Sequence, residues 1–255
     1  MMKMKGSLTA RKIISTTGRS GYYLVNDRPT EAPRVASFVH NLCSTDRIQN
    51  WGCLLLTNSI AKSINREAKQ AASIGIHGCY FRGRRFPLGQ HPESASDFGP
   101  PPPEKRNKGR YNEYGKRVLY LCSDLRTVAT ERSYTPKEPC LYVQTFDIQL
   151  DTARILKLNA DLEDRFSHLH YFLLESEYAA EGTTFAKFPY RATHFIAEIC
   201  RRLGIDAVEY PSIRGGYKDN SDAVNLVIFE PYCDSICSMA VDRPFKYKDN
   251  QPSPD

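Results

Sequence analysis

The chain has 255 residues, of which 41% are hydrophobic and 25% charged, and its formal net charge is +6 at pH 7. This composition is typical of a globular protein and excludes a disordered one, and the length allows one core-bearing domain with an extension. No apolar run of about 18 residues occurs, so we expect no membrane span, and the basic N-terminus lacks the apolar stretch of a secretory signal. The positive charge fits either an anionic partner or a solvated basic surface. The basic residues form no concentrated stripe, and this argues against a dedicated nucleic-acid binder.

The N-terminal part divides into two segments. Residues 1 to about 30 are polar and rich in Gly, Ser and Thr, so we expect them to be loose. From Glu31 to about Gly75 the pattern is helical, with apolar residues at helical spacing at Ile60, Ile64, Ala68 and Ala71. This predicts a helical N-terminal extension, which either packs on the main domain or binds a partner.

At Gly78 the sequence changes character. "CYFRGRRF" predicts a short aromatic strand rich in Arg, and six prolines between Pro87 and Pro103 predict a loop. The run "PPPP" fits a stiff surface loop or a polyproline ligand.

Strands and helices alternate after this loop. Residues 118–122 predict a strand, and Asp124 can cap a short helix that ends before Pro136. "CLYVQTFDIQL" predicts another strand, which "RILKL" extends, and a mixed helix follows over 161–178. "YRATHFIAEICRRLGI" is an amphipathic helix ended by Gly204, and "DAVEYPS" and "NLVIFEP" are closing strands before a tail expected to be frayed. The pattern predicts an α+β fold with a mixed sheet.

Eight cysteines lie at irregular spacing. The close pairs Cys233-x3-Cys237 and His40-x2-Cys43 have no matching second half, so we predict no metal site. Two cysteines are predicted to be small, buried hydrophobic residues: Cys122 in an apolar strand and Cys200 on an apolar helix face. A reduced, cytoplasmic protein is the simplest interpretation.

The common nucleotide-binding and hydrolase motifs GxxxxGK[ST], GxGxxG, HExxH and GxSxG are absent. The stretch "GRYNEYGKRVLYLCSDLRTVATE" instead spaces three polar residues over a loop, a strand and a helix. Arg110 follows a glycine that permits close approach, Tyr120 lies on the strand face of Val118 and Cys122, and Glu131 lies at the margin of the helix's apolar face. These three could face one cleft, or they could be an ordinary ion-paired acid and a packed tyrosine.

A second polar group follows the penultimate strand. In "EYPSIRGG", Pro211 holds the chain extended and Ser212 comes at the strand end, where sheets often build sites. Arg214 with the two following glycines makes this loop a candidate neighbour of a phosphate, although a turn serine alone usually has no such role.

Four blocks in this order, "YFRG", "GRYNEYGKRVLYLCSDLRTVATE", "YRATHFIAEICRRLGIDAVEYPSIR" and "NLVIFEP", resemble the RES domain family over residues 78–231. By position, the resemblance gives the family's arginine as Arg110, its strand tyrosine as Tyr120, its helix glutamate as Glu131 and its late serine as Ser212. Arg82 matches an early arginine, although the Pro-rich loop before Arg110 is long. Residues 1–76 then form an N-terminal extension, 77–232 the RES domain and 233–255 a polar tail.

The resemblance implies a fold similar to that of ADP-ribosyltransferase toxins, and a toxin or effector that consumes NAD+. The expected reaction breaks the nicotinamide–ribose bond with water or phosphate as acceptor, with NAD+ as substrate and no separate cofactor. Arg82 and Asn112 are the expected binding residues, and Arg110, Tyr120, Glu131 and Ser212 the catalytic ones. An antitoxin or immunity protein is the expected partner. Transfer of ADP-ribose to a protein is the alternative, and a non-catalytic basic binding module is the third possibility.

Overall fold

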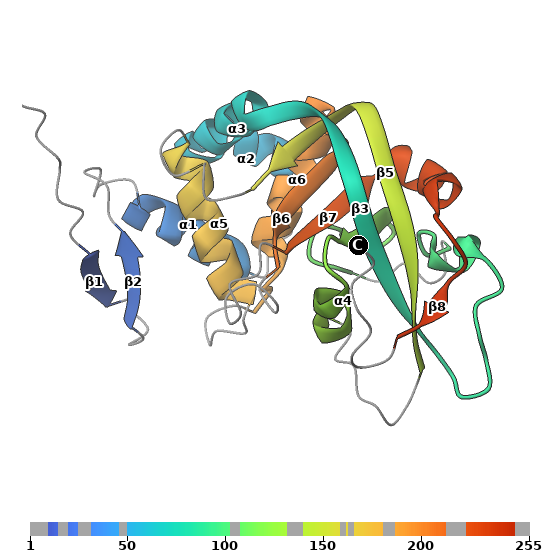
Figure 1. Ribbon diagram of the computed structural model, residues 1–255. Helices are drawn as coiled ribbons and strands as arrows, with labels where there is room; N and C mark the ends of the chain where they lie inside the picture. Colours follow the sequence, from blue (N-terminus) through green and yellow to red (C-terminus); the bar gives the residue numbers. More distant parts are fainter. Residues whose placement is uncertain are drawn as a thin grey trace, which may run out of the picture.

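The computed structural model describes residues 10–14, 20–24, 32–45, 50–102, 108–131, 140–158, 162, 166–180, 187–212 and 223–247 (Figure 1). Near the N-terminus, β1 (Ala10–Ile14) and β2 (Ser20–Leu24) form an antiparallel pair, so the expectation of a loose segment was wrong for these two stretches. Three helices follow: α1 (Ala32–Ser44), α2 (Trp51–Thr57) and α3 (Ser59–Ala71). None of the helices described is long and apolar enough to cross a membrane.

Six strands build the main sheet, in the order β3-β4-β7-β6-β5-β8. They are β3 (Ala72–Phe86), β4 (Val118–Cys122), β5 (Cys140–Lys157), β6 (Ala207–Pro211), β7 (Val224–Phe229) and β8 (Phe245–Lys246). Only β5 and β6 pair in parallel among these strands, so the sheet is mixed, as predicted.

The long strands β3 and β5 are paired along almost their whole length, and β3 also touches β4 at Phe81 and Cys122. The sheet therefore closes on itself, with the β3–β5 ribbon lying across β6 and β7 in Figure 1. β3 begins seven residues before the predicted strand "CYFRGRRF", which starts at Cys79, and the boundary predicted after residue 76 falls inside β3. A register shift between Ile74 and Ile76 accompanies Gly75, whose φ of +81° suits a glycine.

Helices cover the sheet and complete the α+β fold. They are α4 (Leu125–Glu131), α5 (Ser167–Ala180) and α6 (Arg191–Leu203), with the short 3₁₀ helices η1 (Ala95–Phe98) and η4 (Tyr232–Met239). Asp124 accepts hydrogen bonds from the backbone N–H (2.6 Å) and hydroxyl (2.7 Å) of Thr127, so it caps α4 as predicted. Gly204 ends α6 with a φ of +64°, also as predicted. The tail over residues 241–255 was expected to be frayed, but β8 lies within it.

Two hydrophobic clusters lie on opposite faces of β4. Val118 belongs to the cluster that α1, α3, α5 and α6 share, and Tyr120 packs against this cluster. Leu119 and Leu121 belong to the cluster between the β3–β5 ribbon and the β4–β7–β6 layer. The alternation predicted for this strand is confirmed, and it decides which side chains can reach a site on the helical side of the sheet. Cys122 and Cys200 are buried, also as predicted.

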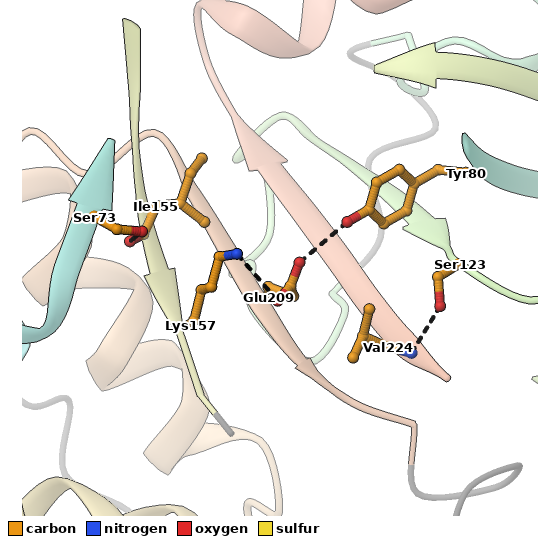
Figure 2. Close-up of polar contacts among 7 residues, drawn as sticks. All are labelled: Ser73, Tyr80, Ser123, Ile155, Lys157, Glu209 and Val224. Carbon is orange, nitrogen blue, oxygen red and sulfur yellow. Dashed lines mark hydrogen bonds and ion pairs between the residues drawn. The ribbon is translucent and has the colours of Figure 1, made fainter. Parts of the chain in front are cut away.

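One polar group lies within the cluster under the β3–β5 ribbon. Tyr80 of β3 donates a hydrogen bond of 3.0 Å to Glu209 of β6, and Lys157 of β5 lies 4.0 Å from the other carboxylate oxygen (Figure 2). Burial first, and the adjacent carboxylate second, raise the pKa of Tyr80 well above its ordinary value, so the hydroxyl stays protonated and donates. This contact links the ribbon to the layer beneath it.

Candidate active site

A cavity of about 380 Å³ opens beside β4. Four aromatic residues, one from each of four segments, line it: Phe81 of β3, Tyr120 of β4, Tyr210 of β6, and Tyr190, which precedes α6. Arg110 also lines the cavity, and its guanidinium carbon lies 5.7 Å from the centre of the Tyr210 ring. Aromatic walls together with arginine suit a flat ligand that carries negative charge.

The loop "GRYN", residues 109–112, carries Arg110, and the Tyr120 hydroxyl holds it. This hydroxyl donates to Asn112 Oδ1 (2.9 Å) and accepts from the backbone N–H of Tyr111 (2.8 Å). Tyr111 is buried, and its ring packs 4.7 Å from that of Tyr210. The loop is therefore fixed to the sheet directly after Arg110.

Gly109 is required by this same contact. A Cβ atom at residue 109 would lie 2.5 Å from Asn112 Oδ1 and 2.8 Å from the Tyr120 hydroxyl, closer than real Cβ contacts come. The glycine therefore permits the loop to close onto Tyr120, which is a specific form of the close approach predicted from the sequence.

Tyr120 serves the site through its ring and through the loop it holds. Burial raises the pKa of its hydroxyl well above the ordinary value, and the Tyr111 N–H and the nearby Arg110 and Arg201 oppose only part of this. The hydroxyl is thus neutral near pH 7, and its single proton is given to Asn112. It is not placed to act as a base.

Asn112 is 4% exposed, and its amide also donates to the carbonyls of Glu113 (3.3 Å) and Lys116 (3.4 Å). These contacts commit it to the turn that follows the loop, and it does not line the cavity. The sequence predicted a substrate-binding role, which stays a prediction, whereas the contacts indicate a structural one.

Arg82 lies at the cavity but is only 7% exposed. Its guanidinium Nη1 lies 3.5 Å from the carbonyl oxygen of Tyr120, and on β5 it faces Gln144, which is fully buried. This placement supports β4 from inside the protein and leaves little surface for a phosphate.

Ser212 directly follows β6 and has no exposed surface, and its backbone N–H donates to the Ala223 carbonyl at 3.0 Å. It is not among the residues that line the cavity. Glu131 is the last residue of α4, three positions after Val128, which does line the cavity; its side chain lies outside the described residues. Arg214 and the two glycines after it lie outside them as well.

Sequence reasoning missed the contribution of α6 to the site. Thr193 Oγ1 donates to the carbonyl of Arg110, and His194 Nε2 lies 2.8 Å from the carbonyl of Gly109. Because a carbonyl only accepts, His194 must carry its proton on Nε2. The signal was present as two polar residues, Thr193 and His194, inside an apolar helix face, where they would need buried partners.

The described residues contain no group of three or more His, Cys, Asp or Glu side chains able to hold a metal ion. Apart from the aromatic rings, the polar and ionisable side chains that line the cavity are those of Arg82, Arg110, Cys122 and Asn225.

Comparison with known proteins finds a matching family model and a distantly similar solved structure. The model of the RES domain family matches residues 84–248, more than half of the chain. A chain from the crystal structure of the M. tuberculosis MbcT–MbcA toxin–antitoxin complex matches with a TM-score of 0.45 and 12% identity, covering 74% of this chain and 94% of that one. This structural similarity is too distant to bear on substrate or partner. No curated protein matches the chain.

Proposed function

Because the chain belongs to the RES domain family, we propose that it consumes NAD+ by breaking the nicotinamide–ribose bond, with water or phosphate as acceptor. Loss of NAD+ would make the protein a toxin or effector acting in the cytoplasm, restrained by an antitoxin or immunity protein. The observation that carries this proposal is the cavity of about 380 Å³, in which Arg110 lies among four aromatic residues.

The reaction sets three demands. Nicotinamide leaves as a neutral molecule, so no acid is needed to protonate it, while positive charge develops on the ribose ring as the bond breaks. The enzyme must grip the diphosphate, hold the flat nicotinamide, and stabilise the developing charge, as carboxylates do in glycosidases. Arginine meets the first demand because its planar fork pairs with phosphate oxygens.

The cavity supplies candidates for two of these demands. Arg110, half-buried against Tyr210, would bind the diphosphate or the nicotinamide ribose. The rings of Tyr120 and Tyr190 would form walls for the nicotinamide. Arg82 would assist mainly by supporting β4, since its guanidinium contacts the Tyr120 carbonyl.

The third demand falls to Glu131, which we propose as the essential carboxylate. It follows the cavity residue Val128 by one helical turn at the end of α4. Ser212 would orient this carboxylate or a ribose hydroxyl, and because it is fully buried it would act from behind the cavity wall.

Replacing Glu131 tests the proposal directly. Glu131→Gln preserves shape and removes the charge, so we expect the rate of NAD+ cleavage to fall by a factor of about 10²–10⁴. Purified wild type and variant are incubated with NAD+, with and without phosphate, and the products are resolved by mass. Glu230→Gln, at an exposed residue after β7, is the matched control and should leave the rate unchanged. Near-normal turnover by Glu131→Gln would overturn the assignment.

The same experiment separates the alternatives. Free ADP-ribose indicates hydrolysis and ADP-ribose 1″-phosphate indicates phosphorolysis, while label attached to protein indicates an ADP-ribosyltransferase. If wild type leaves NAD+ intact, even with cell lysate as a source of acceptor or activator, the domain is a binding module. Salt-sensitive binding to duplex DNA would then support the basic-module reading.

A further inference from the structure

The first turn of α6 holds the backbone of the loop that carries Arg110. Two consecutive carbonyls of the loop, those of Gly109 and Arg110, each accept a hydrogen bond from a side chain of this turn, His194 and Thr193 respectively. Both donors are buried, with exposed fractions of 9% for His194 and 3% for Thr193, and they are adjacent in the sequence. Such an arrangement fixes the position and the direction of the peptide on either side of the Arg110 Cα atom.

The opposite side of the loop is held by Tyr120, through the N–H of Tyr111 and the side chain of Asn112. The loop is thus clamped between a strand and a helix that come from sequence positions about 70 residues apart. Between the two attachments, the Arg110 guanidinium lies over the ring of Tyr210, and both residues line the cavity. Its backbone is fixed by α6 and its side chain by the aromatic wall.

We propose that Thr193 and His194 are positioning residues that set where the Arg110 guanidinium meets the phosphates of the substrate. This inference rests on the proposed function, because it assigns Arg110 to a phosphate-bearing substrate. His194 acts through its Nε2 proton and Thr193 through its hydroxyl, which it shares between the carbonyl of Arg110 and that of Tyr190 at 3.0 Å. Neither side chain lines the cavity.

The test uses matched pairs of variants at each position. His194→Gln retains an N–H donor near the Nε2 position, and His194→Leu removes it at similar size; Thr193→Ser retains the hydroxyl, and Thr193→Val removes it. The removing variants should raise KM for NAD+ about tenfold with a smaller change in kcat, because phosphate binding contributes before and during the chemical step. The retaining variants should stay within about threefold of wild type. Equal losses from both members of each pair would overturn the proposal, since packing alone would then explain them.

A double-mutant cycle with Arg110→Ala separates positioning from general damage. If His194 acts through Arg110, His194→Leu should add little further loss of kcat/KM to Arg110→Ala. Additive losses would show that His194 acts independently of Arg110 and would overturn the proposal. If His194→Leu does not fold, the same double-mutant cycle is run with Thr193→Val and Thr193→Ser, because Thr193 donates to the Arg110 carbonyl itself.

A measurement that needs no NAD+ distinguishes an error in the proposed loop contacts from an error in the proposed function. Amide hydrogen exchange of the peptide containing residues 109–112 should be faster in His194→Leu and Thr193→Val, and restored in the retaining variants. Unchanged exchange overturns the clamp. Faster exchange in a protein whose wild type never consumes NAD+ would retain the clamp and reject the proposed function, and with it the substrate role of Arg110.

Discussion

Tyr80 and Tyr120 make similar contacts on opposite faces of the sheet, and the comparison separates fold from site. Each is a strand tyrosine whose hydroxyl donates to a side-chain oxygen, at 3.0 Å and 2.9 Å, and burial raises the pKa of each. Tyr80 joins β3 to Glu209 on β6, so its bond spans 129 residues and connects two strands of the core. Tyr120 bonds within nine residues and holds one loop beside the cavity. The first contact should matter for stability, and the second for activity.

Among changes at the two tyrosine contacts, the largest effect on activity should come from crowding the Tyr120 contact. Gly109→Ala places a Cβ atom 2.5 Å from Asn112 Oδ1, so the loop must move away from Tyr120 and carry Arg110 with it. We expect kcat/KM for NAD+ to fall by about 10²-fold, the scale of a misplacement near 1 Å. Gly52→Ala, in α2, meets only the tips of the Arg202 and Asn50 side chains and serves as the control. Equal activity in the two variants would contradict this account of the loop.

Removing the Tyr120 hydroxyl should have the next largest effect. Tyr120→Phe keeps the ring wall but leaves the Tyr111 N–H and Asn112 Oδ1 without this partner, so we expect kcat/KM to fall about tenfold. The midpoint of urea unfolding should change by the equivalent of only about 1–2 kcal/mol. An unchanged kcat/KM would show that the loop holds its position without the hydroxyl.

Tyr80→Phe should give the converse result. It removes the donor to the Glu209 carboxylate, whose side chain is 16% exposed, and we expect a loss of about 1–2 kcal/mol in the free energy of unfolding. kcat/KM should remain within about twofold of wild type, because Tyr80 lies outside the cavity lining. Denaturant unfolding and NAD+ kinetics on the same preparation check both halves. A tenfold loss of activity here would remove the distinction between the two tyrosines.

The smallest expected effect is a pH dependence of stability from His194. Burial lowers the pKa of His194, and the hydrogen bond to Gly109 offsets only part of this. The unfolded chain then binds the proton more readily than the folded one below about pH 6.5, the ordinary histidine value. The free energy of unfolding should therefore be fully retained above that pH and decline as pH falls below it. His194→Gln should weaken this decline, and identical pH profiles for the two proteins would refute the assignment.

The sequence predicted those parts of the fold whose signals are local. The face alternation of β4, the Asp124 cap and the Gly204 helix end all depend on residues within one element, and all three are confirmed. The pairing of β8 with β5 was missed, because a two-residue strand has no periodicity to read and forms only through its distant partner. The length of β3 was underestimated for a similar reason, since its first residues gain their strand conformation by pairing with β5.

The candidate site was only partly predictable. Arg110 and Tyr120 line the cavity, but the sequence did not show that the Tyr120 hydroxyl donates its proton to Asn112 or that Arg82 is largely buried. These outcomes depend on side-chain contacts between elements. The roles of all six predicted site residues, Glu131 and Ser212 included, stay predictions. Thr193 and His194 illustrate the same limit, because their partners are backbone carbonyls, which carry no residue identity in the sequence.

The buried Glu67 of α3 has a practical consequence for anyone who trims this protein. Its carboxylate accepts a hydrogen bond from the backbone N–H of Leu169 (2.8 Å) and contacts His168 (2.9 Å), both in the first turn of α5. A residue that precedes the family match therefore holds the start of a helix that lies within the match. A fragment starting at residue 84 would also lose the first twelve residues of β3 and leave the matching length of β5 as an open edge. Such a fragment should aggregate, so expression of this domain should retain the helices that precede β3.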